Sequence, residues 1–335
     1  MKRQIRNSLV ILFGVGILFF LLSKVQGERV VALLWGSDPF YLILGIALSL
    51  IQPVFDTMKW NLLLKSKRIT IPFYQLFFSQ MIGLFVSSFL PSRYSGDIYR
   101  AYVVAKHSGQ AHDSAAAVLV QRLSGLFVMG LLSFIASTVG FVTLGDYTLV
   151  RSVMAGSVAI VVGCFLVFSE KVFRGFDRVL EGLNLSIVRK PAAKFHMAVM
   201  EYKDKKELIA KICLLSLLFY LGAFIIVFGA ARAVRAEVSL LYVVLVVPII
   251  YLLEALPISI NGLGVREGAF AFFFTRVGVS LEQAVAAALV VLFFRLLKSG
   301  AGGVLFVFRY VEFKSIKKPD TLLALGRQDG GRIEG

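Results

Sequence analysis

The chain has 335 residues, of which 58% are hydrophobic and 17% are charged, and its formal net charge is +16. Soluble domains are less apolar and contain about 25% charged residues, so this composition indicates an integral membrane protein. The three histidines argue against metal and histidine-relay chemistry, and the two cysteines, which lie inside apolar runs, argue against a disulfide framework or a zinc site.

Six long apolar runs predict helices that cross the membrane. Each run approaches or exceeds the roughly 20 residues that a helix needs to span a bilayer. The first run is short and flanked by basic residues, like a signal peptide, but no small-residue cleavage site follows Leu22, so we expect a retained helix. The six runs are 8–22, 39–55, 114–141, 150–168, 209–231 and 284–308.

Two further apolar regions, 73–105 and 238–274, are interrupted by Leu-Pro followed by glycine and charged residues. Proline stops a helix and glycine allows a tight reversal of the chain. Cytoplasmic loops of membrane proteins are enriched in lysine and arginine. Three stretches of this chain are strongly basic: 58–71, 169–208 and the segment after Phe308. All three face the cytoplasm only if each interrupted region enters and leaves the membrane on the same side. We therefore predict two re-entrant helical hairpins, with both termini cytoplasmic.

The predicted domain organisation is a single transmembrane domain, 1–308, followed by a basic and disordered cytoplasmic tail, 309–335. Within the cytoplasmic loop 169–208, Phe173 and Phe176 begin an apolar face at helical spacing, which indicates an amphipathic helix on the anionic leaflet or a plain linker helix. Because the basic residues follow the topology, and no basic-aromatic binding module is present, no nucleic-acid partner is expected.

An internal repeat connects the two interrupted regions. The pattern Leu-Pro-x4-Gly-x3-Arg occurs in both, as LPSRYSGDIYR at 90–100 and as LPISINGLGVR at 256–266. The match continues after a three-residue gap, and each region then enters an alanine-rich helix with one deep arginine, Arg122 or Arg295. This match indicates duplication, with repeats at about 73–143 and 238–308. The predicted topology makes the copies face opposite ways, which is the inverted repeat found in many transporters.

Charged residues within these segments form the candidate site, because a buried charge costs at least ~2.5–3.5 kcal/mol at the centre of a membrane helix. Pairing of Asp97 with Arg100, and of Arg266 with Glu267, could simply lock the hairpin tips. However, six cations, including Lys298, face three carboxylates, and unpaired arginines suit a phosphate that they bind bidentately. The predicted substrate-binding residues are Arg93, Asp97, Arg100, Arg122, Glu254, Asn261, Arg266, Glu267 and Arg295, and the predicted hairpin-forming residues are Pro91, Gly96, Pro257, Gly262 and Gly264.

Other polar residues give weaker signals. Asn261 could cap a half-helix instead of binding a head group, and Lys298 could extend toward the cytoplasm. Asp56 and Lys59 are expected to form a pair at the membrane interface. The sequence contains no convincing catalytic triad, paired-carboxylate site or Walker-type phosphate loop, so we expect neither an enzyme nor a cofactor.

The stretches LPSRYSGDIYRAYVVAKHSG with AAAVLVQRL, and LPISINGLGVREGAF with AAALVVLFFR, resemble the signatures of the lysylphosphatidylglycerol synthase transmembrane, or flippase-like, family. The first motif has one extra residue between Arg93 and Gly96, and the second motif is the more specific. The resemblance covers nearly the whole chain and implies a domain that translocates lipid. Nothing like the aminoacyl-transferase domain of multi-domain members follows Phe308.

The predicted fold is therefore an all-α polytopic membrane protein with six crossings and two re-entrant hairpins. We expect it to move an anionic lipid, or a lipid-linked head group, between the leaflets of a prokaryotic cytoplasmic membrane. Two alternatives remain open: a transporter of a small anionic solute, and a non-transporting scaffold for a lipid-modifying enzyme partner.

Overall fold

The computed structural model describes residues 23–89, 94–143, 147–182, 186–255 and 262–316, and this described part of the chain is helical and contains no strand. Five helices are long and apolar enough to cross a membrane, which confirms the all-α polytopic fold and five of the six predicted crossings. The sixth, 8–22, lies outside the described residues. The five helices are α3 (Pro39–Lys65), α6 (Ala111–Thr143), α7 (Tyr147–Val167), α10 (Lys206–Ala233) and α13 (Leu281–Ile316).

Helix α3 is longer than the apolar run that predicted it. Asp38 caps its start by accepting a hydrogen bond of 2.9 Å from the Phe40 backbone N–H, and the helix continues past Pro53 to Lys65. Consequently Lys59 lies inside the bundle, where it is 2% exposed, and its amine is 2.8 Å from the Asp56 carboxylate. The expected pair between Asp56 and Lys59 is confirmed, and it lies within α3 and does not end the helix.

Both interrupted regions form pairs of helices. The first consists of α4 (Phe73–Phe89) and α5 (Ser95–Ser108), and the second of α11 (Leu240–Ala255) and α12 (Val265–Thr275). In each pair the two helices pack against each other. Of the predicted hairpin-forming residues, Gly96, Gly262 and Gly264 are described, whereas Pro91 and Pro257 lie outside the described residues.

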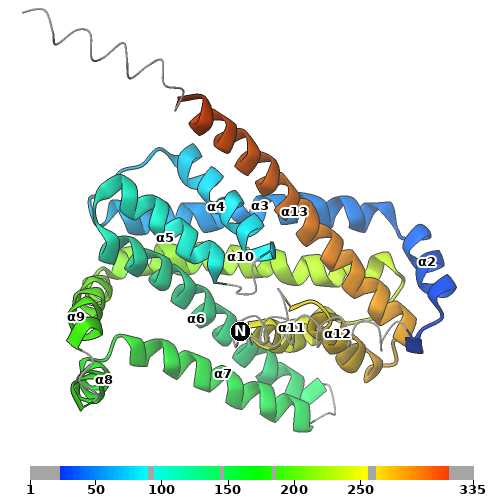
Figure 1. Ribbon diagram of the computed structural model, residues 1–335. Helices are drawn as coiled ribbons and strands as arrows, with labels where there is room; N and C mark the ends of the chain where they lie inside the picture. Colours follow the sequence, from blue (N-terminus) through cyan, green and yellow to red (C-terminus); the bar gives the residue numbers. More distant parts are fainter. Residues whose placement is uncertain (1–22, 90–93, 144–146, 183–185, 256–261, 317–335) are drawn as a thin grey trace, which may run out of the picture.

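The two hairpins open at opposite ends of the bundle. At the end of α3 that contains Lys65, Lys67 pairs with Asp113 at the start of α6 at 2.9 Å, which places the open end of the first hairpin there. At the other end of α3, the Asp38 N–H donates to the Ala233 carbonyl at 3.0 Å, and Gln283 of α13 donates to the Arg235 carbonyl at 2.8 Å. The second hairpin therefore opens at that end (Figure 1).

Contacts between the long helices and the hairpins come in matched pairs. Helix α13 packs against α4, and its counterpart α6 packs against α11. Likewise, α3 packs against α6 and α10 against α13, while α3 and α10 pack against each other. Each half of the chain thus places its long third helix against the hairpin of the other half.

The contact between α13 and α4 depends on glycine. A Cβ atom added at Gly302 would lie 2.1 Å from the Met81 carbonyl oxygen, and one at Gly303 would lie 2.7 Å from the Phe85 ring. By contrast, a Cβ at Gly300, on the same helix, has no neighbour within 4 Å. The two backbones therefore approach as closely as helices do at small-residue contacts in membranes.

We expect Gly302→Val to destabilise the protein, because the side chain would force α4 and α13 apart. Overpacking of this kind costs about 1–3 kcal/mol, which lowers the melting temperature by several degrees. Thermal unfolding of detergent-purified protein measures the effect, with Gly300→Val as the matched control. Equal melting temperatures for the two variants would contradict the close contact.

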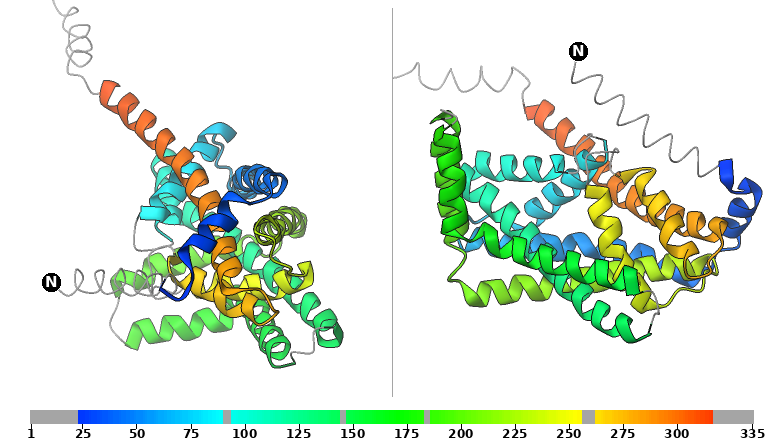
Figure 2. Two further views of the ribbon diagram at one scale, coloured as in Figure 1. Left: turned by 90° about the vertical axis from the view of Figure 1, so that its right-hand side faces the viewer. Right: turned by 90° about the horizontal axis from the view of Figure 1, so that it is seen from below.

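Helices α8 (Glu170–Gly182) and α9 (Ser186–Met200) lie at one end of the bundle, with α9 running across the long helices (Figure 2). The Phe173 ring of α8 stacks on the His196 ring of α9, with centroids 3.9 Å apart and planes within 3°. The side chain of Phe176 lies outside the described residues. Attachment of this helix pair to the leaflet stays a prediction.

Docking of α8 on α9 is expected to weaken in acid. Burial lowers the pKa of His196, and Glu170 opposes this only in part. Because the unfolded pKa of histidine is ~6.5, docking is strongest above that pH and weakens as the pH falls through the lower pKa of the docked state. Hydrogen exchange of α8 and α9, corrected for intrinsic rates, should rise between pH 7 and pH 5. His196→Phe should remove this rise, and an unchanged rise in that variant would exclude the histidine as its cause.

Candidate functional site

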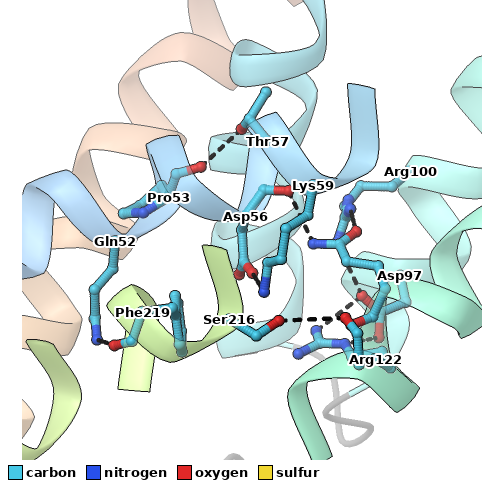
Figure 3. A network of polar contacts seen from close by, with 12 residues as sticks. Gln52, Pro53, Asp56, Thr57, Lys59, Asp97, Arg100, Arg122, Ser216 and Phe219 are labelled. Atoms are coloured by element: carbon cyan, nitrogen blue, oxygen red, sulfur yellow. Dashed lines mark hydrogen bonds and ion pairs between the residues drawn. The ribbon is translucent and has the colours of Figure 1, made fainter. Parts of the chain in front are cut away.

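The first ion cluster, formed by Asp97, Arg100 and Arg122, joins α5 to α6 (Figure 3). Arg122 donates from Nε and Nη2 to the two oxygens of Asp97, at 2.9 and 2.8 Å. Arg100 donates from Nη1 to the same carboxylate at 3.3 Å. One carboxylate thus serves two guanidinium groups, and the fork of Arg122 is matched to both of its oxygens.

The two arginines of this cluster differ in access. Arg100 is 2% exposed, its guanidinium carbon lies 4.3 Å from the centre of the Trp60 ring, and it also donates to Gln121. The Arg122 side chain is 48% exposed, although the Asp97 carboxylate that it binds is largely buried. In this conformation an incoming ligand would therefore meet Arg122 before Arg100.

Polar residues of α3 extend the cluster through the bundle. Gln121 donates to the Asp56 carbonyl at 3.0 Å, and Asp56 in turn pairs with Lys59. Further along the same face, Gln52 donates to the Phe219 carbonyl at 3.3 Å and accepts from Lys298 at 3.3 Å. Our sequence analysis missed Gln52, Trp60 and Gln121 as site residues. The spacing Gln52-x3-Asp56-x2-Lys59, which places the three residues on one helical face, was the available signal.

The second ion cluster, formed by Glu254, Arg266, Glu267 and Arg295, joins α11, α12 and α13. Arg295 donates from Nη2 to both oxygens of Glu254, at 3.0 and 2.8 Å. Arg266 donates to the adjacent Glu267 and lies 3.8 Å from Glu254. The Glu254 and Glu267 side chains are 0% exposed, Arg266 is 1% exposed and Arg295 is 20% exposed, so this cluster is more enclosed than the first.

Glycine geometry shapes the start of α12. Gly262 and Gly264 have φ values of +78° and +81°, a region that glycine adopts without strain. A Cβ at Gly262 would lie 2.8 Å from Cγ of Glu254, and the Gly264 N–H donates to the Glu267 carboxylate at 2.7 Å. The two glycines therefore let the chain turn closely around the buried carboxylates.

The predicted site residues fall into two groups. The structure contains both predicted local pairs, Asp97 with Arg100 and Arg266 with Glu267. Each cluster is formed by residues of one hairpin and of the long helix that follows it in the chain. Arg93 and Asn261 lie outside the described residues.

The long-range partners differ between the halves. Arg122 binds Asp97 on the second arm of its hairpin, whereas Arg295 binds Glu254 on the first arm of the other. Under the alignment of the two halves, Arg295 lies one helical turn further along its helix than Arg122 does. The two segments therefore differ in how their charged residues pair.

Comparison with known proteins establishes the family. The family model described as "Lysylphosphatidylglycerol synthase TM region" matches residues 7–302. The chain belongs to this family. Two relatives of the lysylphosphatidylglycerol synthase TM-region family, both named "UPF0104 membrane protein" and both from Methanothermobacter thermautotrophicus, are similar over nearly their whole length. One is 25% identical, over 85% of this chain and 90% of the relative, and the other is 24% identical, over 86% and 89%.

A third relative is a UPF0104 membrane protein of Methanocaldococcus jannaschii, which is 28% identical over 32% of each chain. In the protein described here, both ion clusters lie within residues 7–302, the part of the chain that the family model matches. Family membership and the apolar helices together identify an integral membrane protein.

Proposed function

We propose that the protein moves an anionic lipid, or a lipid-linked head group, between membrane leaflets. The observation that carries the proposal is Arg122, a half-exposed arginine held in place by a buried carboxylate inside a bundle of membrane-spanning helices. A charged guanidinium within a bundle of membrane helices is energetically costly, so its presence there indicates a function. With Nε and Nη2 directed at Asp97, the remaining N–H donors of this guanidinium suit a phosphate.

The charge balance favours the first ion cluster, with its α3 neighbours, as the head-group site. Among the described residues, Lys59, Arg100 and Arg122 face Asp56 and Asp97, which leaves one excess positive charge. In the second ion cluster the two arginines face two glutamates, so the charges balance. We assign ligand binding to the first cluster and mainly structural pairing to the second.

The arrangement of the helices also supports a transporter. We propose that 73–143 and 238–308 are inverted repeats, since their hairpins open at opposite ends of the bundle and their packing partners correspond. In inverted-repeat transporters, substrates bind near interrupted helices. Both ion clusters lie beside such interruptions, at the start of α5 and at the start of α12.

Location and reaction class follow as part of the same proposal. We place the protein in a prokaryotic cytoplasmic membrane with both termini inside, because the basic loops lie at the end of the bundle where the first hairpin opens. We propose transport without catalysis. A small anionic solute carrier and a scaffold for a lipid-modifying enzyme remain the alternative functions.

Lipid movement in proteoliposomes tests the proposal. Vesicles reconstituted with the wild-type protein and a trace of head-group-labelled lipid are treated with a reagent that destroys label only in the outer leaflet. Labelled phosphatidylglycerol should become accessible faster than in protein-free vesicles, and faster than labelled phosphatidylcholine. Equal rates with and without protein, for every anionic lipid tried, would exclude unassisted translocation and favour a scaffold.

A further inference from the structure

A cavity of about 480 Å³ lies between α4 and α5, outside both ion clusters. This volume is within the range of small-molecule binding sites. Ile82 of α4 and Val104 of α5 contribute apolar walls, and Phe306 of α13 closes one side. The cavity is therefore formed by the first hairpin together with the helix that packs against it.

The lining is mostly apolar, with Gln75 and Ser79 among its polar residues, and it reaches the open end of the hairpin. Leu76 and Val104 are buried in the lining, whereas Lys106 and His107, near the end of α5, are exposed. Tyr102 and Phe306 are 60% and 40% exposed, so aromatic side chains of the lining also reach the outside of the bundle. An apolar interior with a cationic rim matches a molecule that has an apolar chain and an anionic head.

The inner end of the cavity is closed by a helix contact. A Cβ at Gly96 would lie 2.1 Å from the Gly83 carbonyl oxygen, so α4 and α5 touch there. Arg100 packs at the same contact, since a Cβ at Gly83 would lie 3.3 Å from its Cγ and Cδ atoms. The hairpin is thus a wedge that separates the cavity from the head-group site at Arg122.

We infer that this wedge binds one anionic phospholipid, with an acyl chain between α4 and α5 and the phosphate against Lys106 and His107. The inference rests on the proposed function for its choice of a lipid, but it does not require translocation. The lipid lies in the ordinary orientation of the leaflet at which the first hairpin opens. The lipid would then lie on the same hairpin that carries Asp97 and Arg100 of the first ion cluster at its closed end.

Native mass spectrometry of the full chain in detergent tests the wedge. Titration with phosphatidylglycerol should show one tightly retained lipid, with phosphatidylcholine bound at least tenfold more weakly. Val103→Trp fills the lining and should weaken phosphatidylglycerol binding at least tenfold. The matched control is Ile98→Trp, a change at an exposed residue of α5 outside the cavity lining, and it should bind like the wild type.

A second variant avoids the interior altogether. Lys106→Glu reverses the charge at the rim and should reduce the preference for phosphatidylglycerol over phosphatidylcholine severalfold, whereas Lys171→Glu, on exposed α8, should not. Glycerol 3-phosphate, which has the head-group phosphate without chains, should not compete. If it competes, the site takes a soluble anion and not a lipid.

Two results would overturn the inference: equal retention in Val103→Trp and Ile98→Trp, or an unchanged head-group preference in Lys106→Glu. Should Val103→Trp not fold, the Lys106→Glu comparison decides alone. The assay measures retention and not movement. A protein that retains lipid but does not translocate it therefore refutes the proposed function and supports lipid binding by the first hairpin. A protein that translocates lipid but does not retain it refutes lipid binding by the hairpin and supports the proposed function.

Discussion

Replacement of Arg122 by glutamine is expected to reduce lipid translocation about 10- to 150-fold while the protein still folds. That range corresponds to the ~1.5–3 kcal/mol of a hydrogen bond to a charged group. The fold should survive because Asp97 keeps Arg100 as a partner and the Arg122 side chain is half exposed. Rates in proteoliposomes, normalised to reconstituted protein, measure the effect.

Arg122→Lys sharpens the same test. Lysine keeps the positive charge but loses the planar fork that reaches both oxygens of Asp97, so translocation should still fall substantially. Arg151→Gln, at an exposed arginine of α7, serves as the control for a change in net charge. If Arg122→Gln folds and transports at the wild-type rate, anion binding by the first ion cluster is refuted.

Glu254→Gln is expected to have the opposite signature, a loss of folding. The Glu254 side chain is 0% exposed and accepts both hydrogen bonds from Arg295, while Arg266 lies 3.8 Å away. Removal of its charge leaves the two arginines close together, with Glu267 as the remaining glutamate of the cluster. Breaking a buried ion pair costs about 3–5 kcal/mol, so most of the protein should aggregate during gel filtration.

A paired change separates lost charge balance from lost shape. Glu254→Gln combined with Arg295→Gln restores the balance and should recover part of the monodisperse protein. Glu237→Gln, at an exposed glutamate just before α11, is the matched control. A monodisperse Glu254→Gln single variant with the wild-type melting temperature would show that the second ion cluster is not a structural lock.

Hydropathy and helix-breaking residues accounted for most of the fold. Long apolar runs identified the five described crossings, since a bilayer demands about 20 apolar residues per helix. Leu-Pro with glycine marked the breaks between α4 and α5 and between α11 and α12. The end of α3 escaped prediction because Asp56 and Lys59 resemble the edge of a membrane helix until their partners are known.

The site was predictable in composition but not in pairing. Sequence spacing identified Asp97 with Arg100 and Arg266 with Glu267, which are neighbours along one helix. The bond from Arg122 to Asp97 spans 25 residues and that from Arg295 to Glu254 spans 41, so both depend on how helices pack. Trp60 and Gln121, which surround Arg100, carry no charge and gave no signal within an apolar run.

Because α13 packs against α4, the first hairpin can complete its packing only late in synthesis of the chain. Helix α4 ends at Phe89, but its partner α13 begins at Leu281, about 190 residues later. At a synthesis rate of 5–20 residues per second, the first hairpin waits roughly 10–40 s for the helix that completes its packing. During that interval the close contact between Gly302 and Met81 is absent. A chain released before α13 is made would therefore have its first hairpin packed against α3 and α6 but not against α13, so the final packing of α4 depends on the synthesis of that helix.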